Sequence, residues 1–196
     1  HQLGLLGPKT QCVHMTALGN QDIALLAETG AHVIHCPASN MKLASGTSPV
    51  SQLHSAAVNV ALGTDSAASN NNLNLFGEMR TAALLAKLQA GDATALPAHA
   101  ILAMATINGA RAMGIDHKVG SLEIGKQADL IAVDMNRPET MPMYNPLSQL
   151  VYACSASQVS HSWIDGKLIV EDGIVSNIDF RALAQNVLTW QHRISG

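Results

Sequence analysis

The sequence predicts an α/β fold in its first half and a smaller β-rich region in its second half. Three short apolar segments, residues 11–15, 31–35 and 59–63, have the composition of strands, and helical segments separate them. This alternation is typical of parallel strands, because parallel strands need a long crossover rather than a tight turn. Right-handed units of this kind build either an open sheet or a closed barrel. The β-rich region is predicted to begin at Gly114, where the helical pattern stops.

The segments between the predicted strands differ in character. In the first, Asn20 is expected to cap a helix, Asp22 suits its first turn, and Gly30 suits the left-handed residue after its end. In the second, residues 36–46 are polar and predict a loop, whereas residues 49–57 predict a short helix. Each predicted strand is therefore followed by helical chain that can cover the sheet.

Two longer helices, residues 73–88 and residues 97–112, are predicted before the β-rich region. A strand is then predicted at residues 129–133. The Asp-Gly pair at 165–166 predicts a tight hairpin, because both central residues of a type I′ turn need a positive φ. Residues 179–194 predict a terminal helix.

The composition excludes some classes of partner. The chain has 196 residues, enough for one large domain or two smaller ones. Lys and Arg number 11 against 14 Asp and Glu, without a basic run, which argues against nucleic acid or an anionic membrane as the main partner. No apolar run has the length of a membrane span, and no signal peptide is visible. The apolar, Ala-rich helices are compatible with a homo-oligomer.

The cysteines and the first residue bear on the context of the chain. Cys12, Cys36 and Cys154 are odd in number and widely spaced, so a disulfide framework or a cysteine zinc site is disfavoured. A reducing cytoplasm fits this pattern best. The sequence begins at His1 without an initiator Met, and we expect it to start partway through a longer protein.

Polar residues stand at or near the C-terminal ends of the three predicted strands: His14, His35 and Asp65. These ends share one rim of a parallel fold, where active sites form. Two imidazoles and a carboxylate suit a divalent metal and its activated water. From spacing alone, each histidine can also be a core residue, and Asp65 can form an Asx turn. His32 and His35 are expected on opposite strand faces, with His32 structural if His35 faces a barrel interior.

Four motifs give the sequence a resemblance to a known family. VHMTAL at residues 13–18, HCPASNMKLASG at 35–46 and LGTDSAASNNNLNLFGEMR at 62–80 resemble the amidohydrolase superfamily. Within it, they resemble the branch of 5-methylthioadenosine/S-adenosylhomocysteine deaminases, which is related to chlorohydrolases and guanine-type deaminases. VGSLEIGKQADLIAVD at 119–134 resembles the segment in which the superfamily leaves its barrel for a small β-sandwich. The resemblance covers nearly the whole chain.

The resemblance implies an α/β fold that is the C-terminal part of a TIM-type (β/α)8 metal-dependent hydrolase barrel, plus part of a small β-sandwich. Residues 1–113 would supply barrel units six to eight with the helices that follow. Residues 114–177 would supply the C-terminal part of a composite β-sandwich, and residues 178–196 a C-terminal helix. Three strands cannot close a barrel, so the N-terminal portion of the enzyme is an expected partner.

The resemblance also implies roles for single residues. Asp65 would be a metal ligand and proton shuttle for one divalent metal, expected to be zinc, and His14 would lie beside the attacking water. The family's H-x-H and H-x-x-E motifs do not occur in this chain, so three of four metal ligands and a catalytic glutamate are expected upstream. Ser66 stands where Gly is usual in the family. The residues that could contact substrate, or simply satisfy loop backbone groups, are His35, Ser39, Asn40, Asp65, Ser69 and Asn70.

The implied reaction is the metal-dependent hydrolytic deamination of 5′-methylthioadenosine, S-adenosylhomocysteine or adenosine to the inosine analogue and ammonia. The same chemistry serves a triazine chlorohydrolase or a guanine-type deaminase, which are the alternatives within the superfamily. An inactive fragment or assembly module that lacks the upstream ligands is the alternative outside catalysis.

Overall fold

The computed structural model describes residues 2–196, so His1, the first residue of the predicted barrel segment, lies outside it. Strands β1 (Gln11–Val13), β2 (His32–His35) and β3 (Val60–Leu62) form a parallel sheet in that order. The predicted parallel arrangement is confirmed. The first strand is shorter than predicted, because His14 adopts a left-handed φ of 70° that ends the extended chain.

The connections in this sheet contain more helix than the sequence predicted. Helix α1 (Asn20–Thr29) begins one residue after Gly19, which is the N-cap in place of Asn20, and Gly30 ends it with a φ of 69°. Asp22 stabilises the start because its Oδ2 accepts a hydrogen bond of 2.8 Å from Gly19 N. The connection between β2 and β3 contains α2 (Pro37–Lys42) and α3 (Val50–Ser55), and the short helix α4 (Ala67–Asn70) follows β3.

Three helices then pack beside the sheet: α5 (Leu75–Ala90), α6 (Ala98–Met104) and α7 (Ile107–Ala112). The prediction of one helix over residues 97–112 is wrong, because Thr106 has φ −132° and ψ −100°, which no helix accommodates. Its Oγ1 donates to Leu102 O at 2.7 Å, so the side chain finishes α6 while the backbone turns.

The core lies on one face of the parallel sheet. Val33 and Val60 on that face belong to one buried cluster with Leu53 of α3, Met79 of α5 and Ile101 of α6. The helices therefore cover this face, and their apolar side chains supply the burial that holds the strands.

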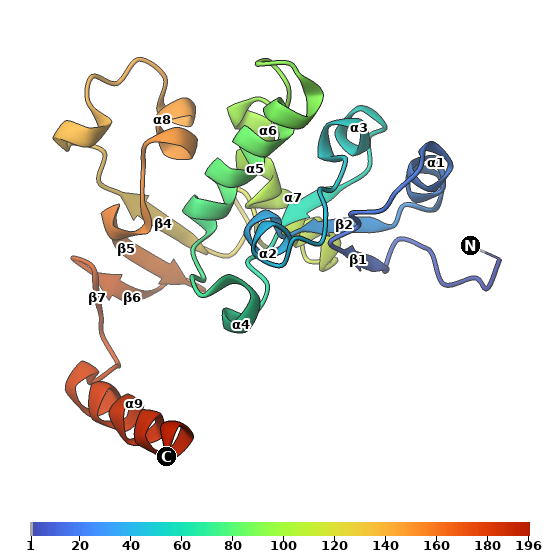
Figure 1. Ribbon diagram of the computed structural model, residues 1–196. Coiled ribbons are helices and arrows are strands. Elements are labelled where there is room, and N and C mark those ends of the chain that lie inside the picture. The colour runs from blue at the N-terminus through green and yellow to red at the C-terminus, as the bar shows by residue number, and fades with distance from the viewer. Residues whose placement is uncertain (1) are drawn as a thin grey trace.

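The C-terminal region contains a second sheet, which is antiparallel and whose four strands are adjacent in chain order. This sheet and strand β1 lie on opposite sides of α5 and α6 (Figure 1). The predicted hairpin is confirmed, because Asp165 and Gly166 have φ values of 52° and 75° between paired strands. Helix α8 (Pro146–Tyr152), which the sequence did not predict, packs against α5 and α6. The strands are β4 (Leu130–Val133), β5 (Val159–Ile164), β6 (Lys167–Glu171) and β7 (Ile174–Val175).

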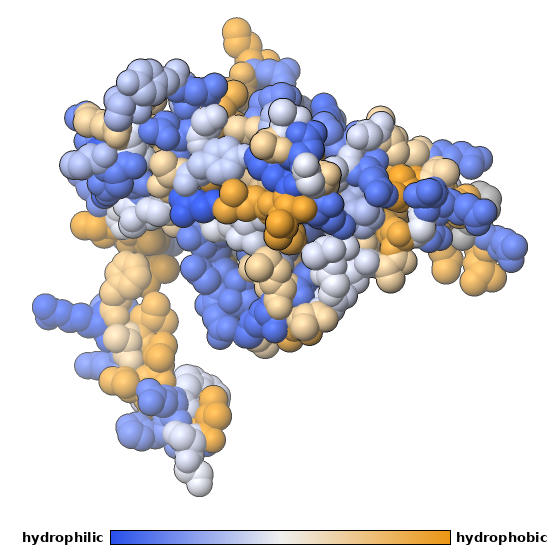
Figure 2. All heavy atoms as spheres, turned by 45° about the horizontal axis from the view of Figure 1, so that its top comes forward, coloured by the Kyte–Doolittle hydropathy of each residue, from blue (hydrophilic) through white to orange (hydrophobic). Residues whose placement is uncertain are grey.

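Helix α9 (Phe180–Ser195) stands apart from the rest of the chain at the end of an extended segment (Figure 1). None of its residues is buried. Apolar side chains run along it on the surface in Figure 2. Within residues 2–196, no helix has both the length and the apolar character that crossing a bilayer would require.

Candidate active site

His14 and Asp65 meet at the C-terminal ends of the parallel strands. His14 directly follows β1, Asp65 follows β3 after two residues, and Nε2 of His14 lies 3.7 Å from Oδ2 of Asp65. Both residues have left-handed backbones, with φ values of 70° and 60°. Such conformations are uncommon outside glycine and concentrate at functional sites, where the surrounding structure holds them. Two strand ends that are 51 residues apart in the chain thus present an imidazole beside a carboxylate.

The carboxylate of Asp65 is held by hydrogen-bond donors from two loops. Oγ of Ser39 donates to Oδ2 at 2.7 Å, and the backbone N–H of Ser66 donates to Oδ1 at 2.7 Å. These bonds lower the pKa of Asp65 to about 2, with the Ser39 hydroxyl as the main cause and Ser69 and Ser66 as smaller ones. Asp65 is therefore ionised at neutral pH, as a metal ligand must be.

His14 is oriented by Asn40. Nδ1 of His14 lies 2.8 Å from Oδ1 of Asn40, and because this oxygen can only accept, the bond places a proton on Nδ1. The other ring nitrogen, Nε2, is the one that faces Asp65. Asn40 is 1% exposed, and its Nδ2 has no hydrogen-bond partner among the described residues.

Ser39 and Asn40 reach the site because they lie on helix α2. The sequence predicted a polar loop for residues 36–46, and that prediction is wrong for its first half. Pro37 occupies the first turn, where its missing N–H leaves no bond unmade and its fixed φ suits a helix. The short helix directs consecutive side chains to two partners, Ser39 to Asp65 and Asn40 to His14.

A buried carboxylate that the sequence analysis missed lies behind these loops. Glu78, in the first turn of α5, is 2% exposed. Its Oε1 accepts from Nδ2 of Asn70 at 2.7 Å, and its Oε2 accepts from the backbone N–H of Ala38 at 3.2 Å. Burial raises the pKa of Glu78. A signal was present in the sequence, since Glu78 shares the apolar face of its helix with Ala82, four residues later.

Ser69 and Asn70 shape the loop after β3. Oγ of Ser69 donates to Ser66 O at 3.2 Å and lies 3.3 Å from Oγ of Ser66. Nδ2 of Asn70 donates to Thr64 O at 2.7 Å as well as to Glu78. The amide donors of Asn70 are thus occupied within the protein, in agreement with the loop-satisfying alternative for this side chain.

His35 and His32 lie on opposite faces of β2, as the alternation predicts, but the faces are exchanged. His35 is 1% exposed and shares its face with Val33, which the helices cover. Burial, and secondarily the charge of His14, lower the pKa of His35 to about 4, and its Nδ1 has no partner among the described residues. His32 lies on the other face, where Nδ2 of Asn59 donates to its Nδ1 at 3.0 Å.

The described residues do not by themselves group enough donors for a metal site. Within residues 2–196, no three His, Cys, Asp or Glu side chains are grouped so that they could hold a metal ion. At these strand ends, Asp65 offers an ionised carboxylate whose side chain is 29% exposed, which suits one ligand of a divalent cation. A complete site needs donors from elsewhere.

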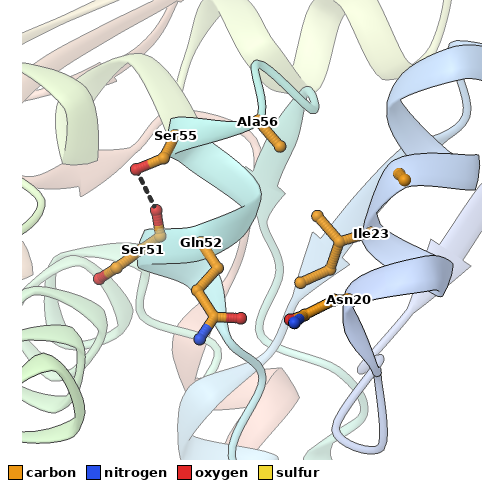
Figure 3. Close-up of a pocket in the computed structure, with 7 residues that line it drawn as sticks. Asn20, Ile23, Ser51, Gln52, Ser55 and Ala56 are labelled. Carbon is orange, nitrogen blue, oxygen red and sulfur yellow. Dashed lines mark hydrogen bonds between the residues drawn. The ribbon is translucent and has the colours of Figure 1, made fainter.

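A surface hollow of about 530 Å³ lies between α1 and α3, and none of the site residues described above lines it (Figure 3). Oγ of Ser55 donates to Ser51 O at 2.9 Å on its α3 side. None of its lining side chains titrates, so it offers no acid, base or metal ligand. The lining residues are Asn20, Ile23, Ala24, Ser51, Gln52, Ser55 and Ala56.

Comparison with known proteins places this chain in a family. The model of the amidohydrolase family matches residues 1–169. A 5-methylthioadenosine/S-adenosylhomocysteine deaminase of Teredinibacter turnerae is 53% identical over 192 residues, which are 98% of this chain and 43% of that protein. A 5′-deoxyadenosine deaminase of Methanosarcina mazei is 48% identical over 177 residues, 90% of this chain and 40% of that protein.

A solved structure is similar throughout. The crystal structure of an adenosine deaminase from Xanthomonas campestris with bound zinc has a TM-score of 0.97 and 49% identity, and the match covers 99% of this chain and 44% of that one. The chain therefore spans less than half the length of the relatives that it matches.

Proposed function

The chain belongs to the amidohydrolase family, and we propose that the full-length protein is a metal-dependent deaminase of 5′-substituted adenosines. The substrate class is that of 5′-methylthioadenosine and S-adenosylhomocysteine, with the inosine analogue and ammonia as products. The observation that carries this proposal is the cluster of His14, Ser39, Asn40 and Asp65 at the strand ends. The names of similar proteins that cover 90% or more of the chain support the substrate class.

The proposed architecture follows the same relationship. Residues 1–113 would form the last three units of a TIM-type (β/α)8 barrel with the helices that follow. Residues 114–177 would form part of a composite β-sandwich, and residues 178–196 a C-terminal helix. The parallel order of β1, β2 and β3 and the TM-score of 0.97 support this architecture.

The proposed cofactor is one zinc ion, for which Asp65 would be the ligand that this chain supplies. The carboxylate fits, because it is ionised, anchored and open on one side. The other ligands would come from the part of the full-length protein that this chain does not contain. When bound, zinc would lower the pKa of a water molecule from 15.7 to about 7.

The residues of this chain would move the protons of the reaction. Asp65 would accept a proton from water as the oxygen bonds to the purine carbon that carries the amine, and would return it to the leaving ammonia. His14 would stabilise the negative charge that develops on oxygen, which requires Nε2 to carry a proton. Asn40 already holds the proton on Nδ1, so the donating form of His14 is the imidazolium.

The proposed substrate contacts differ in how many hydrogen-bonding atoms of their side chains are still without a partner within residues 2–196. Asn40 keeps an unpaired Nδ2 donor and His35 an unpaired Nδ1, so both have hydrogen-bonding capacity for a ligand or a water. Asn70 has spent its donors on Thr64 and Glu78. Asn40 and His35 therefore each keep a polar atom free for a further contact, whereas the donors of Asn70 are both in use.

Ammonia release from 5′-methylthioadenosine by the full-length protein tests the proposal. We expect turnover that disappears when zinc is removed with a chelator and returns when zinc is added back. Release of chloride from a chlorinated triazine without ammonia release from the nucleoside would contradict the proposal in favour of a chlorohydrolase. A full-length protein without stoichiometric metal and without turnover would instead indicate an assembly module.

A further inference from the structure

Glu78 connects two loops that the site needs. Its carboxylate is buried beneath α2 and α4, and each of these short helices supplies one of its two hydrogen-bond donors. Ala38 belongs to the segment that follows β2, and Asn70 belongs to the segment that follows β3. Among the described residues, Glu78 has no cationic partner. Burying an unpaired carboxylate is costly, so a role in stability alone does not explain this side chain.

The hydrogen bond from Ala38 N to Glu78 holds helix α2 in place. The first N–H groups of a helix have no partner within the helix, and the Cys36 side chain does not cap this one. Glu78 supplies the missing acceptor through its bond to Ala38 N, and its negative charge suits a helix N-terminus. Ser39 and Asn40 are the next two residues, so the position of this turn sets both of their contacts with the site.

The hydrogen bond from Asn70 to Glu78 holds the segment that contains Asp65. Asn70 uses one amide nitrogen to reach both Glu78 and the carbonyl of Thr64, the residue directly before Asp65. The left-handed backbone at Asp65 therefore begins from a carbonyl that Asn70 fixes. Through Asn70, Glu78 limits the movement of Asp65 relative to α2.

We propose that Glu78 is a positioning residue, which sets the distance between helix α2 and the Asp65 loop and thereby the Ser39–Asp65 hydrogen bond. The catalytic consequence rests on the proposed function, whereas the geometric consequence does not. Loss of the bridge lets the two loops move independently, so Asp65 loses its fixed orientation while its zinc-binding carboxylate remains.

The test is Glu78→Gln in the full-length zinc protein. Glutamine has nearly the same shape, but its NH₂ group would face one of the two donors, so only one bond survives. Since small misplacements of catalytic groups can cost up to about 100-fold, we expect kcat to fall at least about tenfold, with KM changed less than about twofold. Zinc content, measured by mass spectrometry, should stay at the wild-type level.

Two further variants separate positioning from loss of stability. Ala82→Gly removes only a methyl group from the same helix, at a buried position one turn after Glu78, and it should lower the melting temperature without lowering kcat. Asn70→Ala removes the hydrogen bond between Asn70 and Glu78. Its effect on kcat should be non-additive with that of Glu78→Gln, because both substitutions break the same connection between α2 and the Asp65 segment. Additive effects, or a kcat loss in Ala82→Gly equal to that of Glu78→Gln, would overturn the proposal.

A crystal structure of the Glu78→Gln protein gives a readout that needs no substrate. We expect the Ser39 Oγ to Asp65 Oδ2 distance to exceed the 2.7 Å of the unaltered chain. An unchanged distance together with unchanged kcat would overturn the positioning role. If the wild-type protein does not deaminate the nucleoside, the proposed function fails, and this distance still decides the geometric role of Glu78.

Discussion

Helices α5 and α9 have the same length of 16 residues but opposite environments. Helix α5 buries Phe76, Glu78, Met79, Ala82, Ala83 and Ala86 against the sheet and the site loops, whereas α9 buries none of its residues. Yet α9 also carries an apolar stripe, with exposed Phe180, Leu183, Val187 and Trp190 at helical spacing. An apolar stripe thus predicts that a helix forms, but not that this chain itself provides the surface to cover it.

The difference extends to function. The region around α5 places a carboxylate, a histidine and two hydrogen-bonding side chains within short distances of one another. Helix α9 touches none of them and has no buried polar group. Substitutions of buried residues in α5 should therefore lower stability, and a substitution at Glu78 should also lower turnover, whereas substitutions in α9 should affect neither while its apolar stripe is uncovered.

Asp65→Asn in the full-length protein is the largest expected effect. The substitution replaces one carboxylate oxygen, which accepts a hydrogen bond from Ser39 or Ser66, with an amide nitrogen that cannot accept it. It also removes the carboxylate that would accept the proton from water. We expect turnover to fall about 10³-fold, within the usual range for a general acid–base group. Ammonia release measures it, and Gln185→Ala in α9 is the control with unchanged kcat. Turnover within tenfold of wild type would remove Asp65 from this role.

Met79→Ala and Leu188→Ala compare the two helices directly. Met79 is 4% exposed, so its truncation leaves a cavity and should lower the free energy of unfolding by about 3 kcal/mol. Leu188 in α9 is 56% exposed, and its truncation should change the same quantity by less than about 0.5 kcal/mol. Chemical denaturation measures both. A loss of similar size at Leu188 would show that another surface covers α9 and would end the contrast.

The smallest of the three expected effects is the contribution of Glu78 to the pH dependence of the free energy of unfolding. Burial raises the pKa of Glu78 above its ordinary value of 4.5, so the folded protein binds this proton more tightly than the unfolded chain. The resulting stabilisation is fully present below pH 4.5 and is lost as the pH rises through the raised folded-state pKa. Glu78→Gln has no such proton. Its free energy of unfolding minus that of wild type should therefore increase as the pH rises through this window.

Denaturation of both proteins at several pH values measures this difference, and carboxylates common to the two proteins cancel in it. A difference that does not depend on pH would mean that Glu78 is not buried as described.

Local chemistry made much of the fold predictable. The parallel strands follow from apolar runs separated by helical chain, and the type I′ hairpin follows from Asp165-Gly166. Helix α2 was mistaken for a loop because its polar residues Ser39 and Asn40 are buried against the site and do not face solvent. The break at Thr106 was missed because no Gly or Pro marks it.

The sequence by itself located the three parallel strands to within two residues at each end, and therefore placed His14 and Asp65 at one rim. It did so because strand period and turn propensity depend on neighbouring residues only. Tertiary structure alone decided the rest: which face of β2 the helices cover, which donors reach Asp65, and that Glu78 links two loops. The Ser39–Asp65 and Ala38–Glu78 contacts join residues 26 and 40 positions apart, and a single sequence carries no record of which distant residues meet.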